Sequence, residues 1–412
     1  MALLVAAPGC RRSAPAKKTA AAADASAAPS PTPDPKGRLE PSNVEVYAPA
    51  ELEAQDWTPE PGTHAIVLVG DLMPWERIEE KLAAFGPHHP YLGTAPLVRA
   101  ADLAIANLEG PVAVEATPNS GLRFPYKMPP SILPAIRETG FDLVSAANNH
   151  ALDCGPEGLL ETLKFVGAAG IDLVGAGPTP MAASQPFVTQ VGDTRIAVVA
   201  FMSPETWYSE IEDDSAKEHA FRNKDRRMRK TMMRAPDRPA ALVGDVGTIR
   251  EAVRQASETA DVVIVYPHWG VRYHRPVYPR QREIARAAID AGADLVVGHH
   301  NHIWQPIERY RDALVVYGVG NYAFGSRNRR AKEGLIVRAV VRNKAFERVE
   351  LYPLYTKNLD DKIDFQPKLL KGKSARKMLT RLRDAADEPV AGFGIEGDHA
   401  VVRLVGRNEG RP

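Results

Sequence analysis

The sequence predicts an α/β fold in which the strands of the sheet run mainly parallel. From about Val44 onward, short apolar runs alternate with polar loops and amphipathic segments, which is the pattern of strand, loop and helix. A hydrophobic content of 44% in 412 residues is enough for one large domain or two ordinary ones. Polar side chains directly follow several of the apolar runs, and open α/β folds bind their ligands at that edge of the sheet.

The first half of this region contains five predicted strands, each a short run of mostly aliphatic residues. They are His64–Asp71, Asp102–Gly110, Phe141–His150, Ile171–Val174 and Thr194–Phe201. Two helices are expected between them, over Glu76–Phe85 and Gly155–Ala169. The second helix has Pro156 near its start, where the missing amide donor of proline costs nothing.

Residues 204–244 interrupt the pattern and are rich in Arg, Lys, Met and Asp. We interpret this segment as an insertion over the face where the loops gather. Two readings are open for it. It is either a lid or basic wall for an anionic substrate, or a solvated excursion of the surface.

The second half resumes the alternation of strands and helices. Helices are expected over Val246–Thr259 and Arg280–Ala291, and a basic one over Ser374–Ala386. Buried strands are expected at Asp261–Tyr266, Ala293–Val297 and within the apolar run Ala313–Phe324. Alternating polar and apolar residues at Gly334–Val341 and Phe346–Leu354 indicate an antiparallel part of the sheet, and a last strand is expected at His399–Val405.

The amino terminus resembles the end of a bacterial lipoprotein signal. Residues 1–10 form a short apolar segment that ends in Cys10, and acylation of that cysteine would tether the chain to a membrane on its non-cytoplasmic side. The alternative is an ordinary disordered terminus. Residues 11–43 are dominated by Ala, Pro, Ser and Lys and are expected to form a disordered stalk, and no other segment is long and apolar enough to span a bilayer.

Charge and cysteine content exclude two classes of protein. The formal net charge is +1, which gives no reason to expect a nucleic-acid partner. Only two cysteines occur, Cys10 and Cys154, so no disulfide framework stabilises the fold.

Eight polar side chains fall just after predicted strands, where a mainly parallel sheet would bring them together. They are Asp71, Glu109, Asn149, His150, His268, His299, His300 and His302. Carboxylate, amide and imidazole groups together suit borderline divalent ions such as Mn, Fe or Zn. The sequence therefore predicts a divalent metal site, with two ions bridged by one carboxylate as the expected arrangement.

Six ordered motifs contain these residues: Gly70–Met73, Asn107–Glu109, Asn148–His150 followed by Asp153 and Gly155, His268–Gly270, Gly298–His302, and Gly320–Phe324. Their order and spacing resemble the CapA capsule-synthesis family over about Ile66 to Leu354. That family is associated with making or anchoring the poly-gamma-glutamate capsule. Its fold is similar to that of calcineurin-like metallophosphoesterases, which implies a four-layer α-β-β-α sandwich of mixed sheets.

The resemblance also implies roles for individual residues. The implied metal ligands are Asp71, Glu109, Asn149, His268, His300 and His302, with His299 as an alternative. His150 would be the general acid, and Asp153 would either orient it or cap the following helix. The candidate substrate-binding residues beside these motifs are Trp269, Arg272, Tyr273 and Asn321. The alternatives are that Trp269 covers the rim of the site and that Tyr273 has a surface role.

Two positions depart from the pattern of the family. Leu72-Met73 stands where phosphoesterases have the second ligand of an Asp-x-His motif, so one ion would be weakly held. Arg272 stands where the family usually has glutamate, which favours an anionic substrate.

The expected protein is an envelope-anchored, CapA-like member of a capsule polymer pathway with a metal-dependent hydrolase-like site. It would consist of residues 44–360 with the insertion, followed by a C-terminal extension at 361–412. Its expected partners are a capsule or cell-envelope polymer, a capsule synthase complex, and a membrane through the lipidated Cys10. Two alternatives are open: a catalytically silent scaffold or polymer-binding module, and a phosphoesterase acting on nucleotides or sugar phosphates.

Overall fold

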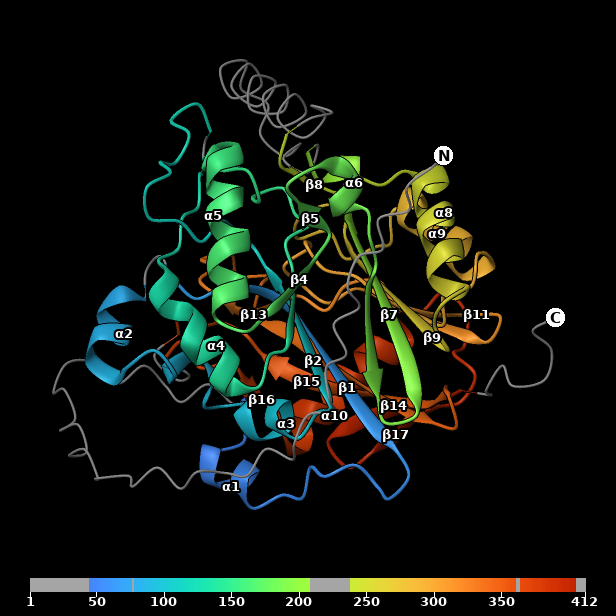
Figure 1. The fold of residues 1–412 in the computed structure, drawn as a ribbon. Coiled ribbons are helices and arrows are strands. Elements are labelled where there is room, and N and C mark those ends of the chain that lie inside the picture. The colour runs from blue at the N-terminus through green and yellow to red at the C-terminus, as the bar shows by residue number, and fades with distance from the viewer. Residues whose placement is uncertain (1–43, 76–77, 123, 208–237, 361–363, 405–412) are drawn as a thin grey trace, which may run out of the picture. The chain divides into compact units, whose positions relative to one another are not determined.

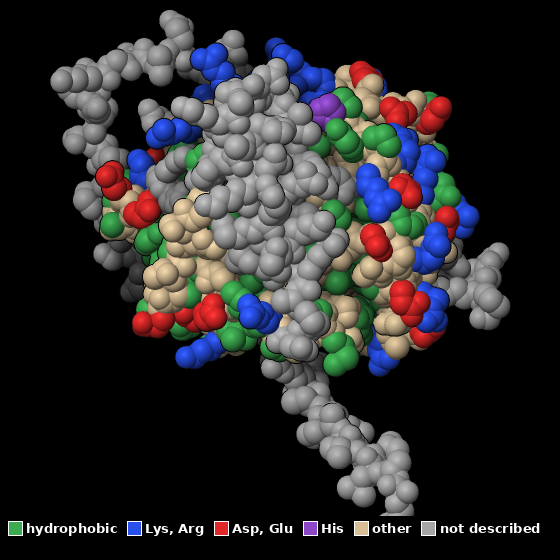
Figure 2. All heavy atoms as spheres, turned by 90° about the horizontal axis from the view of Figure 1, so that it is seen from above, with side chains coloured by type: hydrophobic (Ala, Val, Ile, Leu, Met, Phe, Trp, Pro, Cys, Tyr) green, Lys and Arg blue, Asp and Glu red, His purple; other side chains and the backbone are tan. Residues whose placement is uncertain are grey.

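The computed structural model describes residues 44–75, 78–122, 124–207, 238–360 and 364–404. The predicted lipoprotein segment, the stalk and most of the basic insertion lie outside these residues. Within the part of the chain that is described, no helix is both long and apolar enough to cross a membrane. Acidic and basic side chains are interspersed over much of the face shown in Figure 2.

A large mixed sheet of ten strands forms one half of the described region. Its parallel part contains β1 (His64–Met73), β2 (Leu103–Leu108), β3 (Leu143–Ser145), β4 (Asp172–Val174) and β13 (Asn321–Phe324). Its antiparallel part contains β14 (Glu333–Arg342), β15 (Ala345–Tyr355), β16 (Lys368–Leu369), β17 (Phe393–Glu396) and β18 (His399–Arg403). β1 joins the two parts, because it pairs with β2 on one side and with β14 on the other.

A second mixed sheet has six strands in the order β11-β12-β10-β9-β7-β6. Its strands are β6 (Phe187–Val191), β7 (Thr194–Met202), β9 (Val262–His268), β10 (Leu295–Val297), β11 (Ile307–Tyr310) and β12 (Ala313–Val316). The four central strands are parallel, and the edge strands β6 and β11 pair antiparallel. A short pair, β5 (Ala176–Gly177) and β8 (Ala240–Ala241), lies beside it.

Helices cover the outer faces of both sheets, as Figure 1 shows with α4 and α5 on one side and α8 and α9 on the other. On the first sheet these are α3 (Ala95–Arg99), α4 (Leu133–Thr139) and α5 (Gly155–Ala168). On the second they are α8 (Val246–Ser257) and α9 (Pro279–Asp290). The remaining helices are α1 (Pro49–Glu53), α2 (Glu79–Phe85), α6 (Pro180–Ala183), α10 (Gly372–Asp384) and the short 3₁₀ turns η1 (His89–Tyr91), η2 (Pro130–Ile132) and η3 (Pro204–Trp207).

The alternation of side chains along β1 shows how the layers are built. Ile66 and Leu68 point between the sheets and share a core with Ile196 and Ile264 of the second sheet. Val67 and Val69 point the other way and share a core with helix residues such as Leu133 and Val166. A third core holds α8 and α9 on the second sheet. The predicted four-layer α-β-β-α sandwich of mixed sheets is therefore confirmed.

Some elements differ from those expected. The helix expected from Glu76 begins at Glu79, and the strand expected over 141–150 spans only Leu143–Ser145. The apolar run 313–324 divides into β12 of the small sheet and β13 of the large one, with Gly320 in a left-handed conformation (φ 76°) just before β13. The final predicted strand corresponds to β18, which pairs with β15 in the large sheet.

Candidate metal centre

The ends of strands from both sheets converge on one buried cluster of ligating side chains. Asp71 lies near the end of β1, and Glu109 follows β2 by one residue. His268 is the last residue of β9, and the loop after β10 carries three more histidines at 299, 300 and 302. These groups meet because parallel strands of the two facing sheets end at the same edge of the sandwich.

Three overlapping triads bring candidate ligand atoms within 4.8 Å of one another. They are Asp71, His268 and His299; Glu109, His268 and His300; and Asp71, Glu109 and His302. Every member is at most 3% exposed. The structure therefore unites five of the six predicted metal ligands and also includes His299, the alternative.

The sixth predicted ligand, Asn149, belongs to the same cluster. Its Oδ1 lies 2.7 Å from His268 Nε2, and that nitrogen is also 2.8 Å from His300 Nδ1. On the other side of the ring, His268 Nδ1 lies 2.8 Å from His299 Nδ1. A neutral imidazole has a single N–H and the amide oxygen only accepts, so one ring cannot donate at all three contacts. The neighbouring imidazoles must donate at some of these contacts, or a cation shared by these atoms would take the place of the hydrogen bonds.

The loop that carries the histidines has an unusual backbone. His300 and His302 both have positive φ, 92° and 57°, which is uncommon for residues other than glycine. Such conformations cost about 1–3 kcal/mol each and persist where the surroundings enforce them, often at functional sites. Here Tyr273 N–H donates to the carbonyl of Asn301 at 2.8 Å, which holds the centre of the turn.

Burial sets the charge state of the cluster. It lowers the pKa of His299 to about 4 and those of His268 and His300 well below the ordinary value, so these rings are neutral at pH 7. Burial, together with the charge of Asp71, raises the pKa of Glu109. Burial also opposes ionisation of Asp71, but its hydrogen bond to His302 and the charge of His302 outweigh that effect and lower its pKa.

Three buried ligand atoms have no hydrogen-bond partner among the described residues, Glu109 Oε2, His299 Nε2 and His300 Nε2, and a fourth, Asp71 Oδ2, has only an ion-pair contact with His302 Nδ1 at 3.1 Å. Leaving such atoms unpaired in the interior costs about 1–3 kcal/mol each. Neutral imidazoles, carboxylates and unpaired acceptors form the donor set of a divalent-metal site, so the residues present fit the predicted ion.

His150 lies at the edge of the cluster with a well-defined orientation. Its Nδ1 is 2.6 Å from Asp153 Oδ2, and the ring of Tyr126 stacks on it with centroids 4.1 Å apart. Its Nε2 lies 3.9 Å from Glu109 Oε1. Asp153 also accepts from Tyr126 N–H at 2.8 Å, whereas the N-cap of α5 is Cys154 and makes no side-chain cap. Of the two interpretations of Asp153, the contacts favour orientation of His150.

The predicted substrate-binding residues fall into two groups. Arg272 and Tyr273 are half-buried beside the cluster: the charge of Arg272 acts on Glu109 and His300, and the Tyr273 ring lies 5.6 Å from that of His302. Trp269 is completely buried and packs on Phe201.

The position of Trp269 corrects our expectation that it contacts substrate. The indole donates its N–H to the carbonyl of Tyr317 at 2.8 Å within the core between the small sheet and its helices. Asn321 is also buried, and its Oδ1 lies 2.8 Å from His302 Nδ1, so it supports a candidate ligand and does not face substrate.

Sequence reasoning gave no role to three residues that shape the site. Asn107 donates to Asp71 Oδ1 at 2.9 Å, and Asn148 donates to Asn107 Oδ1 at 3.1 Å. Both stand in motifs already recognised, so their position beside Glu109 and Asn149 was an available signal. Tyr126 comes from a loop with no motif, and only the folded chain brings its ring onto His150.

Solved structures similar to the chain include a phosphatase from Mycoplasma pneumoniae and the NAD nucleotidase NadN of Haemophilus influenzae. The first is 13% identical with a TM-score of 0.41 and covers 74% of this chain and 99% of its own. The second is 12% identical with a TM-score of 0.38 and covers 79% and 63%.

Sequence relatives are more informative. The PGA biosynthesis protein CapA of Bacillus subtilis is 27% identical over 320 residues, which are 77% of this chain and 75% of that protein. The capsule biosynthesis protein CapA of Bacillus anthracis is 27% identical over 296 residues, 70% of this chain and 66% of that protein. The family described as bacterial capsule synthesis protein PGA_cap matches residues 65–326, a range that includes every candidate ligand. The predicted resemblance is thereby confirmed, and the chain belongs to the PGA_cap family of bacterial capsule synthesis proteins.

Proposed function

We propose that this chain is a metal-dependent hydrolase that acts in the assembly of a capsular polymer of the poly-gamma-glutamate type. The observation that carries the proposal is the buried cluster, in which two carboxylates and four histidines form three overlapping triads. Burying so many hydrogen-bond acceptors against one another costs free energy, and apolar side chains of similar volume would fill the same space at a lower cost in free energy. A purely structural role therefore does not account for the cluster.

The candidate ligands would hold one ion or two. Asp71, Glu109 and His268 each belong to two triads, so they are the residues able to serve a pair of ions. A bound divalent ion supplies Lewis-acid polarisation of a phosphoryl or acyl oxygen in such sites. The imidazole and carboxylate donors favour Mn, Fe or Zn over Mg.

His150 is the proposed proton donor. Asp153 accepts from its Nδ1 and Tyr126 stacks on its ring, so the opposite nitrogen, Nε2, is directed toward Glu109. In the imidazolium form, which carries a proton on both nitrogens, Nε2–H is the group that would protonate a leaving group and leave the ring neutral. Asp153 fixes the tautomer and orientation of the ring, as carboxylates do for other catalytic histidines.

The surroundings of the cluster support an anionic substrate. Arg272 is close enough for its charge to act on Glu109 and His300. The loop after β13 adds exposed cations at 327, 329 and 330, and Arg330 Nη1 reaches the carbonyl of Tyr273 at 3.5 Å. An exposed cationic loop of this kind favours carboxylates of a polymer as binding partners.

The central experiment measures metal content and turnover of the full chain. We expect the parent protein, purified without chelator, to retain divalent metal and to hydrolyse a generic phosphodiester or poly-gamma-glutamate. Asp71→Asn and His300→Gln should lose most of the metal and at least about tenfold in rate, since each removes a ligand. His150→Asn should retain metal and lose about 100-fold in rate.

His88→Gln is the matched control, because His88 lies at the surface and pairs with Glu138 away from the cluster. It should behave as the parent does. Metal without turnover on either substrate would favour the polymer-binding scaffold, and a parent that binds no metal after reconstitution would contradict the proposal.

We further propose that the chain is tethered at the cell envelope through lipidated Cys10, which lies outside the described residues. Cys10→Ala should then move the protein from the membrane fraction to the released fraction and abolish labelling by a fatty-acid probe. Unchanged fractionation of this variant would contradict the tether and would leave the catalytic proposal untouched.

A further inference from the structure

A second cavity lies on the outer face of the large sheet, apart from the metal centre. Its volume is about 410 Å³, and its walls include Tyr47, Trp57, Arg338, Tyr352 and His399. Arg338 pairs across the sheet with Val67, four residues before Asp71 on β1, which is roughly 13 Å along the strand. This volume is within the range of small-ligand sites.

The sheet face under the cavity is polar where a sandwich normally has an apolar one. Along β15 the side chains at 348, 350 and 352 point to this outer face, while Val349 and Leu351 point into the core between the sheets. Arg338 and Glu350 are 8% and 4% exposed. The segment between α1 and β1 lies over them, with Arg338 Nη2 donating to the carbonyl of Trp57 at 3.3 Å.

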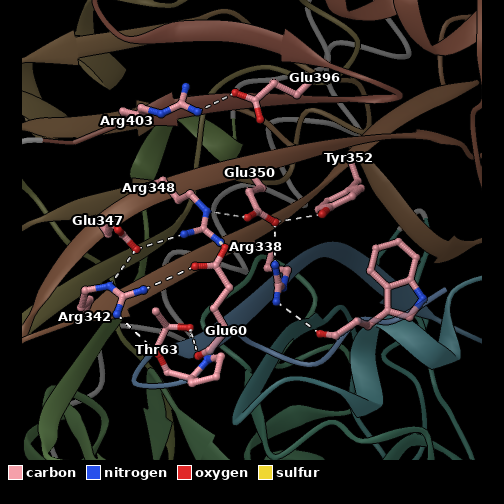
Figure 3. A network of polar contacts seen from close by, with 12 residues as sticks. Glu60, Thr63, Arg338, Arg342, Glu347, Arg348, Glu350, Tyr352, Glu396 and Arg403 are labelled. Atoms are coloured by element: carbon pink, nitrogen blue, oxygen red, sulfur yellow. Dashed lines mark hydrogen bonds and ion pairs between the residues drawn. The ribbon is translucent and has the colours of Figure 1, made fainter.

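The polar floor consists of arginines and glutamates in mutual contact, as Figure 3 shows. Glu350 accepts from Arg338 Nη1 at 2.7 Å and from Arg348 Nε at 2.8 Å. Arg348 also contacts Glu60 at 3.1 Å and Glu347 at 3.0 Å. Arg342 joins this network through Glu347, and Arg403 forms a separate pair with Glu396. The charged groups that line the cavity are Arg338, Arg348, Asp56, Glu60, Glu396 and Asp398, so the lining offers both donors and acceptors and has no excess of positive charge.

Aromatic rings form the walls above this floor. Trp57 meets Tyr352 edge to face with centroids 5.6 Å apart, and Tyr352 stacks on His399 at 4.8 Å. The indole is held in place because its N–H donates to the carbonyl of Leu52 at 3.0 Å. At the rim, Tyr47 donates its hydroxyl to Asp398 at 2.7 Å. These rings present fixed apolar faces beside hydrogen-bonding groups of both kinds.

We infer that this cavity binds a neutral saccharide unit. A hydroxylated ring both donates and accepts, which matches a floor of paired guanidinium and carboxylate groups, and its C–H face packs on aromatic side chains. An anionic polymer does not fit, because the arginines are already neutralised and Asp56 and Asp398 add negative charge to the lining. An apolar ligand does not fit, because it would leave the charged floor unsolvated.

The test titrates the full-length protein with maltotriose, cellobiose and chitotriose as neutral probes, and with hexaglutamate as an anionic comparator. Binding is read from tryptophan fluorescence and from saturation-transfer NMR. At least one neutral probe should bind with a Kd below about 10 mM, and Trp57→Ala should weaken it about tenfold, which is the range expected for one aromatic contact. Trp57→Phe should restore part of the affinity.

Asp398→Asn is the second variant, since it changes the rim without removing a ring. Met181→Ala is the control, because Met181 is 76% exposed and does not line the cavity. Near-UV circular dichroism checks that each variant is folded. Asp71→Asn should bind the saccharide as the parent does, which separates this site from the proposed catalytic one.

Three results would overturn the inference. The first is absence of saturable binding by all three neutral probes. The second is binding that Asp71→Asn abolishes and that Trp57→Ala and Asp398→Asn leave unchanged. The third is tighter binding of hexaglutamate that is weakened by Trp57→Ala.

Discussion

His299 is completely buried between Asp71 and the rings of Tyr266 and His268, and this environment makes the stability of the metal-free protein depend on pH. Its pKa falls from 6.5 to about 4, mainly through burial. Between these values the unfolded chain binds a proton that the folded chain does not, so stability is lost as pH falls from 6.5 toward 4. The folded-state pKa values of His268 and His300 act in the same direction.

Denaturation of chelator-treated protein at several pH values between 4 and 7 would measure this effect. His299→Gln should reduce the slope of the free energy of unfolding against pH by up to about 1.4 kcal/mol per pH unit. The reason is that the folded and unfolded chains no longer differ by the proton on this ring. Glu109 acts in the opposite direction, since its raised pKa favours the folded state at low pH. Met181→Ala is the control and should have the slope of the parent. If the slope of the free energy of unfolding against pH were also unchanged in His299→Gln, the pKa of His299 would not be lowered in the folded protein.

At the scale of elements, the parallel pairing of β1 with β13 positions the site. Asp71 pairs in register with Asn321, and its N–H donates to the carbonyl of Gly320 at 3.2 Å. A Cβ on Gly70 would collide with that same carbonyl, so only glycine allows the two strands to approach. The Gly-Asp dipeptide of the first motif is thus required by packing as well as by chemistry.

Gly70→Ala should therefore destabilise the protein by about 3 kcal/mol or more and reduce metal retention, since backbone must move to relieve the clash. Gly394→Ala in β17 is the matched control, because no atom lies within 4 Å of its added Cβ. Urea denaturation of both variants and their metal content would be compared with the parent. Equal stability of the two variants would mean that β13 is not packed on β1 as described.

At the scale of the whole molecule, one buried network ties the chain before β1 to the antiparallel half of the large sheet. Burial opposes ionisation of Glu350, but the charge and hydrogen bond of Arg338 and the bonds from Arg348 and Tyr352 outweigh it and lower its pKa. Its contribution to stability is therefore present above the ordinary pKa of 4.5 and is lost as pH falls through the lower folded-state value.

Arg338→Met should destabilise the protein by about 3 kcal/mol at pH 7, because it leaves Glu350 with less charge compensation in the interior. Arg254→Met is the control: Arg254 pairs with Glu251 and Glu258 but is exposed on α8, where solvent screens the ion pairs and little change is expected. Similar losses of stability in the two variants, measured by denaturant unfolding, would contradict the importance of the buried network.

The sequence by itself determined the fold class, the position of most parallel strands and the set of candidate ligands. These features are local: aliphatic runs mark strands, and the residues that follow them lie at one edge of a parallel sheet whatever the detailed packing. Asp71, Glu109, His268 and the histidine loop were therefore within reach of sequence reasoning, and so was membership of the capsule synthesis family.

Only the tertiary structure decided which way individual side chains face and which distant segments meet. Trp269 stands next to His268 in the chain, yet packing turns its indole into the core, and His299 joins the cluster because a bridge aligns it with His268. Tyr126 reaches His150 through a long-range contact that leaves no periodic trace in the sequence. The alternation over residues 346–354 indicates a polar face of the sheet, but only the folded chain shows which segment covers that face. Residue type and spacing specify whether a segment can form a helix or a strand. The register between distant strands and the direction of each side chain follow from packing of the whole molecule.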